Sequence, residues 1–322
     1  MLRLMCLAFI WITLILISVN VAGKNFTSAL LPGEHQLGMR TRFQHVDDPW
    51  LGEASAFTTR LKLTSIFTLD DKESWNIAIE PNYVHAFNDG DYNSVTIQQQ
   101  TSPIADAENF SWSQVNLQYH NDENLHITVG RQALAFDNER MIGANEFWQT
   151  PQRFDAVKLD YNDQVKWHIQ YAYSNKVHRI FGSKSNKDIP KEDVRYPQFL
   201  SGDLTQRPVN EWGEHRLNSH LLNIHYKTDN NINIVGYGYL LENKDQPWFS
   251  SNTVGFRIFD EFKPHQFKYR YTVEYARQHG SDNNPENFHN WYYLLSASIQ
   301  YKSHLLQLNQ EVFSEDNNIG FM

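Results

Sequence analysis

Basic side chains recur two residues apart in several stretches of this chain. In an extended strand, residues i and i+2 point to the same face, so each such pair presents two cations side by side. Guanidinium groups bind carboxylates in a bidentate way, and ammonium groups attract them as point charges. The spacing therefore predicts a surface that binds anions. The candidate residues are Arg40, Arg42, Arg60, Lys62, Arg257, Lys268 and Arg270.

The stretches that carry these cations alternate between apolar and polar residues. In the clearest of them, 266–278, Tyr269, Tyr271 and Val273 alternate with Lys268, Arg270 and Thr272. A period of two indicates a strand with one apolar and one polar face. The pattern predicts thirteen strands, at 35–46, 56–69, 74–88, 110–120, 125–131, 156–161, 165–176, 220–227, 232–241, 252–259, 266–278, 291–301 and 305–313.

The connections between these strands alternate in length. Turns of three or four residues at 70–73, 121–124, 162–164 and 228–231 are interspersed with longer, polar connections. Short turns at one end and long loops at the other are typical of outer-membrane β-barrels, which are antiparallel and up-and-down. The two longest loops, 89–109 and 177–218, are expected to constrict or gate the barrel. Because such barrels usually have an even number of strands, thirteen predict a barrel that is C-terminally incomplete.

Composition limits the other possibilities. Residues 1–23 have one basic residue, an apolar run and small residues at their end, which predicts a signal peptide followed by a barrel domain at 24–322. The only cysteine, Cys6, lies in that run, so disulfides and cysteine-bound metals are not expected in the mature chain. A net charge of −9 argues against nucleic acid as a partner. No catalytic or metal-binding motif occurs, and we expect no enzyme activity and no cofactor.

The charges within the predicted strands fall mostly on the polar face. The basic residues there are Arg40, Arg42, Arg60, Lys62, Lys158, Lys166, Lys227, Arg257, Lys268 and Arg270, and the acidic ones are Glu80, Asp160 and Glu274. In a barrel that face lines the interior, so the lumen is expected to be positive and to favour anions. The alternative is that these charges pair with one another and serve only the structure.

One stretch, 130–161, carries a family signature. Its residues Gly130, Arg131, Gln132, Arg140, Ile142, Gly143, Trp148, Phe154 and Asp155 resemble the core motif of the alginate export family. The resemblance implies an outer-membrane β-barrel that conducts an anionic polysaccharide. Arg131 and Asp155 fall on the apolar face of their strands, so we expect them at the rim or beside a β-bulge, with a structural role at the corner of the hairpin.

These observations together predict an all-β outer-membrane channel for passive passage of an alginate-like polysaccharide or smaller anions through a positive lumen. Membrane lipid is an expected partner, and the resemblance allows for periplasmic export partners. Two alternatives stay open from the sequence. One is a general or small-solute porin, and the other is a soluble periplasmic β-sandwich that binds carbohydrate.

Overall fold

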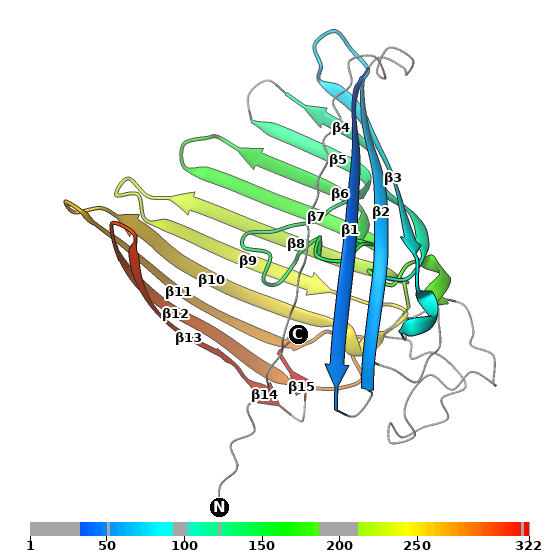
Figure 1. Cartoon of the computed structure of the whole chain (residues 1–322). Coiled ribbons are helices and arrows are strands. Elements are labelled where there is room, and N and C mark those ends of the chain that lie inside the picture. The colour runs from blue at the N-terminus through cyan, green and yellow to red at the C-terminus, as the bar shows by residue number, and fades with distance from the viewer. Residues whose placement is uncertain are drawn as a thin grey trace, which may run out of the picture.

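Thirteen strands form one antiparallel sheet in which every strand pairs with its neighbours in sequence (Figure 1). The computed structural model describes residues 33–49, 52–92, 102, 104–121, 124–186, 212–316 and 319–321, so the predicted signal peptide at 1–23 lies outside the described residues. The strands are β1 (Glu34–Asp48), β2 (Gly52–Thr68), β3 (Trp75–Ala86), β4 (Asn109–His120), β5 (Leu125–Gln132), β6 (Arg153–Asn162), β7 (Trp167–His178), β8 (Glu214–Lys227), β9 (Asn233–Leu241), β10 (Ser251–Phe262), β11 (Phe267–Gly280), β12 (His289–Tyr301) and β13 (His304–Phe313).

The prediction of thirteen antiparallel strands is confirmed, with differences of a few residues at strand ends. The largest difference is β8, which begins at Glu214 inside the stretch expected to be a loop. Short 3₁₀ helices, η2 (Asp89–Asp91), η3 (Ser183–Asn186) and η5 (Pro247–Phe249), lie in the connections, and β14 (Glu315–Asp316) pairs with β15 (Ile319–Gly320). No helix among the described residues is long and apolar enough to cross a bilayer. A two-sheet sandwich is wrong for this chain, because the thirteen strands belong to a single sheet.

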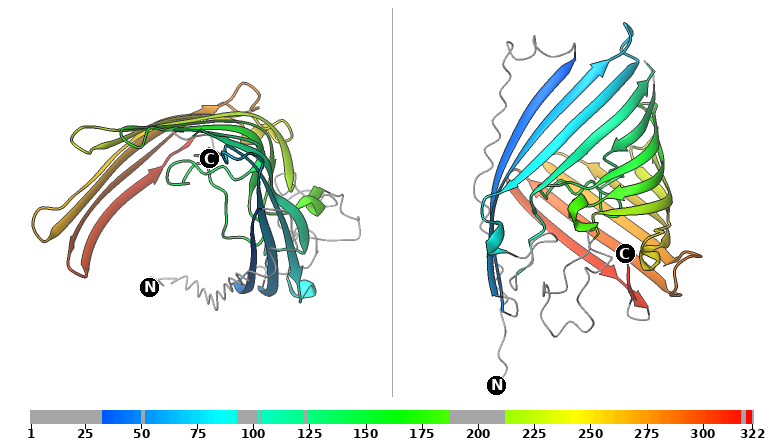
Figure 2. Two further views of the ribbon diagram at one scale, coloured as in Figure 1. Left: turned by 90° about the horizontal axis from the view of Figure 1, so that it is seen from above. Right: turned by 90° about the vertical axis from the view of Figure 1, so that its right-hand side faces the viewer.

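The sheet curves into an open arc. Seen from above, β1 and β13 stand at opposite ends of the curve (Figure 2, left), and no register joins these two strands within the described residues. Connections cross the concave side of the arc. This shape gives the sheet an inner, concave face and an outer, convex face.

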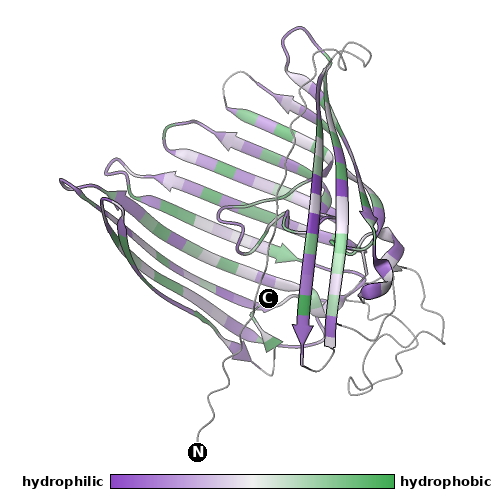
Figure 3. Cartoon of the chain, in the orientation of Figure 1, coloured by the Kyte–Doolittle hydropathy of each residue, from purple (hydrophilic) through white to green (hydrophobic). Residues whose placement is uncertain are grey.

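The two faces differ in polarity as the alternation predicts. Along β11, Val273 is 40% exposed on the outer face, whereas Glu274, Ala276 and Gln278 are buried on the inner face. Bands of opposite hydropathy alternate along most strands (Figure 3). Large apolar side chains on the outer face are suited to lipid, since every exposed strand segment of a membrane barrel must present an apolar surface there.

Turn residues explain why the short connections close tightly. The carboxylate Oδ1 of Asp163 accepts hydrogen bonds from the backbone N–H groups of Val165, Lys166 and Trp167 at 2.8–2.9 Å. Asn121 caps the preceding short turn in the same way, at the N–H groups of Asn124 and Leu125. Such side-chain acceptors replace the ladder partners that a reversing chain loses.

Three register shifts occur in the described part of the sheet. One lies in the pairing of β3 with β4, between Glu80 and Pro81, and the other two adjoin the connection from β7 to β8. The pairing of β6 with β7 shifts between Asp155 and Ala156, and that of β7 with β8 shifts between Ser174 and Lys176. β-bulges of this kind re-aim the side chains that follow them. These bulges therefore set the face of the sheet to which the side chains at the ends of these strands point.

Candidate functional site

The connection from β5 to β6, residues 133–152, lies against the inner face of the sheet, and we call it the inner loop. Its apolar residues Leu134, Phe136 and Ile142 are buried in one cluster with inner-face side chains of β6 to β12, among them Tyr237 and Ala276. Burying a side chain of this size contributes roughly 1.5–3 kcal/mol. The inner loop is therefore held against the wall by its own sequence.

Two arginines of β1 hold the far part of the inner loop. Arg40 donates hydrogen bonds to the carbonyl oxygens of Glu146 and Phe147 at 3.1 Å, and its Nε donates to Gln149 Oε1 at 2.9 Å. Arg42 donates to the Phe147 carbonyl at 3.1 Å, and its guanidinium lies 4.2 Å from the centre of the Phe147 ring. Two cations predicted to face the lumen thus bind a segment that lies on the inner face of the sheet.

Two further ion pairs tie the inner loop to the other side of the arc. Asp137 pairs with Arg257 of β10, and Arg140 pairs with Glu311 of β13 at 2.8 Å. The guanidinium of Arg140 also lies over the ring of Tyr292 on β12, 5.9 Å from its centre. The inner loop therefore spans the concave side from β1 to β13.

A cluster of charges surrounds the attachment near β1. Lys62 lies 3.5 Å from Glu80, and Arg153 lies 2.5 Å from Glu146. Within this cluster, the buried Arg60 Nη1 and Arg153 Nε have no hydrogen-bond partner among the described residues. The basic members of this bore cluster are Arg40, Arg42, Arg60, Lys62 and Arg153, and the acidic ones are Glu80, Asp106 and Glu146. Basic residues outnumber acidic ones in this cluster.

The carboxyl groups that loops contribute to the bore cluster have shifted pKa values. Burial raises the pKa of Asp106, although Arg42, 3.1 Å away, acts in the opposite direction. Burial also acts to raise the pKa of Glu146, but the charge and hydrogen bond of Arg153 outweigh it and lower the pKa below its usual value. Glu146 is therefore a stable anion at neutral pH and a fixed partner for the cations.

The remaining two candidate lumen residues lie elsewhere. Lys268 and Arg270 flank Glu261 at 2.5 Å and 2.7 Å, near the short turn between β10 and β11. They share the inner parity of β11 but do not contact the inner loop. The structure thus brings Arg40, Arg42, Arg60 and Lys62 together, places Arg257 at the opposite attachment, and leaves Lys268 and Arg270 apart.

The family-motif residues divide among three places. Gly130, Gln132 and Phe154 form the corner where β5 and β6 meet, and there the Gln132 side-chain amide donates to the Ala156 carbonyl at 3.0 Å. Arg140, Ile142, Gly143 and Trp148 belong to the inner loop. Arg131 and Asp155 form an ion pair at 2.8 Å on the outer parity of their strands, beside the register shift.

The inner loop crosses the inner face, which was not predicted from the sequence. The expectation that 89–109 and 177–218 constrict or gate the barrel stays a prediction, because 93–101, 103 and 187–211 lie outside the described residues. The count of interior acids was too low, because Asp106, Asp137 and Glu146 enter from loops, and Glu261 and Glu311 lie on the inner face of β10 and β13. The charged residues inside the family motif were the signal that could have identified the inner loop.

The chain is similar to known proteins in sequence and in fold. A protein-family model described as Alginate export matches residues 33–313, and no curated protein is similar enough in sequence to count as a match. The structure is similar to Pseudomonas aeruginosa OccK2 (OpdF) in complex with glucuronate, with a TM-score of 0.57, 11% identity, and coverage of 86% of this chain and 64% of that one. It is also similar to Acinetobacter baumannii OccAB2 (TM-score 0.61, 12% identity, 87% and 67% covered).

A third similar structure is Pseudomonas aeruginosa OpdK with vanillate, at a TM-score of 0.59 and 10% identity, with 87% of this chain and 66% of that chain covered. At such identities the likeness concerns the fold. The chain spans about two thirds of the length of these porins.

Proposed function

The chain belongs to the alginate export family, whose place is the outer membrane and whose members are channels rather than enzymes, and from this premise we propose that it conducts carboxylate-bearing saccharides. The cargo ranges from a single uronate to an alginate-like chain. Passage is passive, because a charged path down a gradient requires no cofactor.

The observation that carries this proposal is the unpartnered Nη1 of Arg60. Its Nη1 is buried beside the inner loop with no acceptor among the described residues, while Arg40 bonds only neutral oxygen atoms of that loop in the contacts described. A buried donor without an acceptor costs about 1–3 kcal/mol, more when it is charged. A carboxylate that reaches this group supplies the missing acceptor and makes a charge-assisted hydrogen bond with it.

The comparison supports the same class of cargo. OccK2 is described in complex with glucuronate, a sugar with one carboxylate, which is also the repeating chemistry of a polyuronate. A cleft lined by one sign of charge raises the local concentration of the opposite sign. Positive charge at the narrowing favours carboxylates over neutral sugars.

A substitution at Arg60 tests the proposal. In planar bilayers under a potassium chloride gradient, Arg60→Gln is expected to lower the anion-to-cation permeability ratio severalfold and to weaken current block by glucuronate or oligo-alginate. Arg277→Gln is the matched control, because Arg277 lies on the outer parity of β11, opposite Val254. Equal selectivity and equal block in wild type and Arg60→Gln would contradict the proposal.

A general small-solute porin is the second candidate. It is favoured by the pairing of Arg42, Lys62, Arg153 and Arg257 with carboxylates, which offsets much of the positive charge. The same recordings separate the two functions. Weak selectivity without block by uronates, in the wild-type protein, identifies the general porin.

A further inference from the structure

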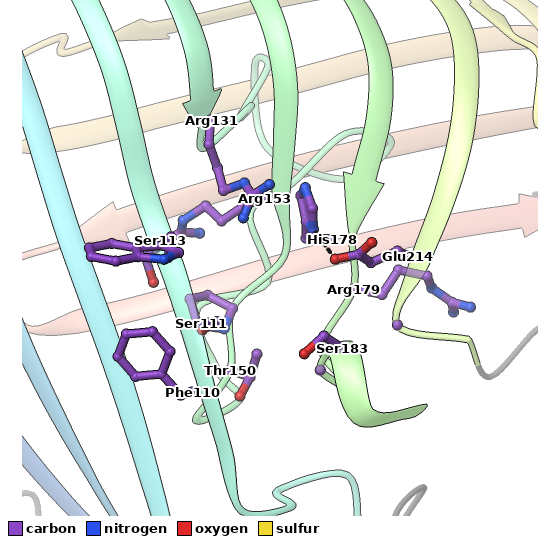
Figure 4. A pocket seen from close by; sticks show the side chains of 14 residues that line it. Phe110, Ser111, Ser113, Arg131, Thr150, Arg153, His178, Arg179, Ser183 and Glu214 are labelled. Carbon is purple, nitrogen blue, oxygen red and sulfur yellow. Dashed lines mark hydrogen bonds and ion pairs between the residues drawn. The ribbon is translucent and has the colours of Figure 1, made fainter. Parts of the chain in front are cut away.

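A gap in the wall lies between β4 and the beginning of β6. β4 pairs with β5 only from Val115 to His120, β5 ends at Gln132, and β6 begins at Arg153. The first half of β4 therefore has a strand neighbour only on the β3 side. A cavity of about 190 Å³ fills this gap, bordered also by the end of β7, by η3 and by the start of β8 (Figure 4). We call it the wall cavity.

The lining of the wall cavity is strongly basic. Among the fourteen lining residues, Arg131, Arg153, Arg179 and His178 face a single acid, Glu214. Figure 4 shows the Arg153 side chain extending toward Ser113, and the His178 ring turned toward Glu214. The arrangement suits an anion.

Two buried polar groups at the wall cavity lack partners. Arg153 is 3% exposed and Ser113 is 1% exposed, and neither Arg153 Nε nor Ser113 Oγ has a hydrogen-bond partner in the part of the chain that is described. Such groups are rare in folded proteins because each costs about 1–3 kcal/mol. Both can donate a hydrogen bond, so the missing partner is an acceptor.

Glu146 and Glu80 lie 2.5 Å and 4.0 Å from Arg153 Nη2 on the bore side, where Glu80 Oε1 has no hydrogen-bond partner among the described residues. The acids on the outer side are already engaged. Asp155 accepts from Arg131 at 2.8 Å and lies 2.9 Å from His178, whose other ring nitrogen lies 3.0 Å from Glu214. Lys176 also lies 3.5 Å from Glu214. This network fixes the basic groups in position without offering an acceptor to Arg153 Nε or Ser113.

The wall cavity lies beside the outer, apolar face. Phe110 and Trp112, which line it, are 51% and 43% exposed, and their rings pack edge to face at 5.5 Å. The register shift between Glu80 and Pro81 leaves Ser113 unpaired in the ladder with β3, so Phe110 and Trp112 share the face of Val115, which is exposed on the lipid-facing side. Aromatic side chains of this kind settle at the level of lipid headgroups.

We propose that the wall cavity binds a phosphate oxyanion, held by Arg153 Nε and Ser113 Oγ, and that its source is the headgroup of an anionic membrane lipid. The site is separate from the bore cluster, with which it shares only Arg153. It gives Arg131, an outward charge of the family motif, a role in the lining of the wall cavity, with Asp155 holding its guanidinium in position. The proposal does not depend on which solute the channel conducts.

The test measures binding to the full-length chain in detergent. Native mass spectrometry follows adducts of phosphatidylglycerol, with phosphatidylcholine as the zwitterionic comparison, and calorimetry follows inorganic phosphate. Ser113→Ala removes one hydrogen bond to a charged group and is expected to weaken binding about tenfold or more. Ser298→Ala, on the inner parity of β12 and outside the cavity, is expected to bind as the wild type does.

Each outcome has a defined meaning. Phosphatidylglycerol binding that Ser113→Ala weakens supports the site with lipid as its source, and the same loss for inorganic phosphate alone supports the site with a soluble source. Failure of both probes to bind, or equal binding by wild type and Ser113→Ala, overturns the proposal. The wall cavity would then hold only water. The hydroxyl of Ser113 has no hydrogen-bond partner in the described part of the chain, so its loss is not expected to impair folding. Arg131→Lys, expected to weaken binding as well, provides a second variant.

Discussion

Gly130 shows how one residue fixes the corner at which the inner loop departs. Its φ is +122°, and a Cβ atom there would lie 2.4 Å from the backbone oxygen of Val115 on β4. No L-residue adopts this conformation without strain. The motif marked Gly130 from the sequence alone, but the reason for glycine became visible only with β4 alongside it.

Gly130→Ala is expected to destabilise the protein by about 2 kcal/mol or more, because backbone strain of roughly 1–3 kcal/mol adds to the collision with β4. Thermal unfolding in detergent, followed by circular dichroism, measures the effect. Gly236→Ala on β9 is the control, since a Cβ atom at Gly236 meets nothing within 4 Å. A melting temperature for Gly130→Ala equal to that of the control would refute this account of the corner.

At the scale of elements, the strands could be predicted, whereas the contacts that place the inner loop on the inner face could not. Alternation is a local property, so the sequence reveals each strand without knowledge of its neighbours. The contacts of the inner loop join residues far apart in sequence: Arg40 and Gln149 are separated by 109 positions and Arg257 and Asp137 by 120. No local pattern encodes such pairings. The same limit applies to Asp106, which the sequence places in a polar loop and the structure places against Arg42.

The attachment of the inner loop is expected to depend on pH through Glu146. Its pKa is lowered, so the stabilisation it provides is complete above the ordinary pKa of a glutamate, about 4.3, and is lost as pH falls through the lower, folded-state value. Because the side chain is 51% exposed, the effect should not exceed about 1 kcal/mol.

The test measures the melting temperatures of the wild type and of Glu146→Gln at several pH values between 6 and 3. The wild type should be the more stable at pH 6, and the difference should shrink below about pH 4. Asp106, whose raised pKa acts with the opposite sign, is present in both proteins and cancels from the difference. A difference that stays constant over this range would show that Glu146 does not hold the inner loop by charge.

For the whole molecule, the decisive property is which face of the sheet meets lipid. Composition alone suggests a soluble protein rather than a membrane protein, since the mean hydropathy is −0.58. Period-two alternation resolves the difference, because it gathers apolar side chains on one face while the average stays polar. The thirteen strands keep this sidedness throughout the arc, and the inner loop covers part of the polar face.

Adjacent positions on β11 allow a direct test of sidedness. Val273 is exposed on the outer face, and Thr272 has the inner parity, opposite Phe259. In the middle of a membrane strand, lysine on the lipid face costs about 2–4 kcal/mol, whereas inside the bore it keeps its water. Val273→Lys is therefore expected to lower the yield of protein folded into lipid vesicles and its resistance to urea, and Thr272→Lys to leave both near the wild-type values. The reverse order would mean that the concave, cationic face meets lipid, and the anion path through the bore would have to be abandoned with it.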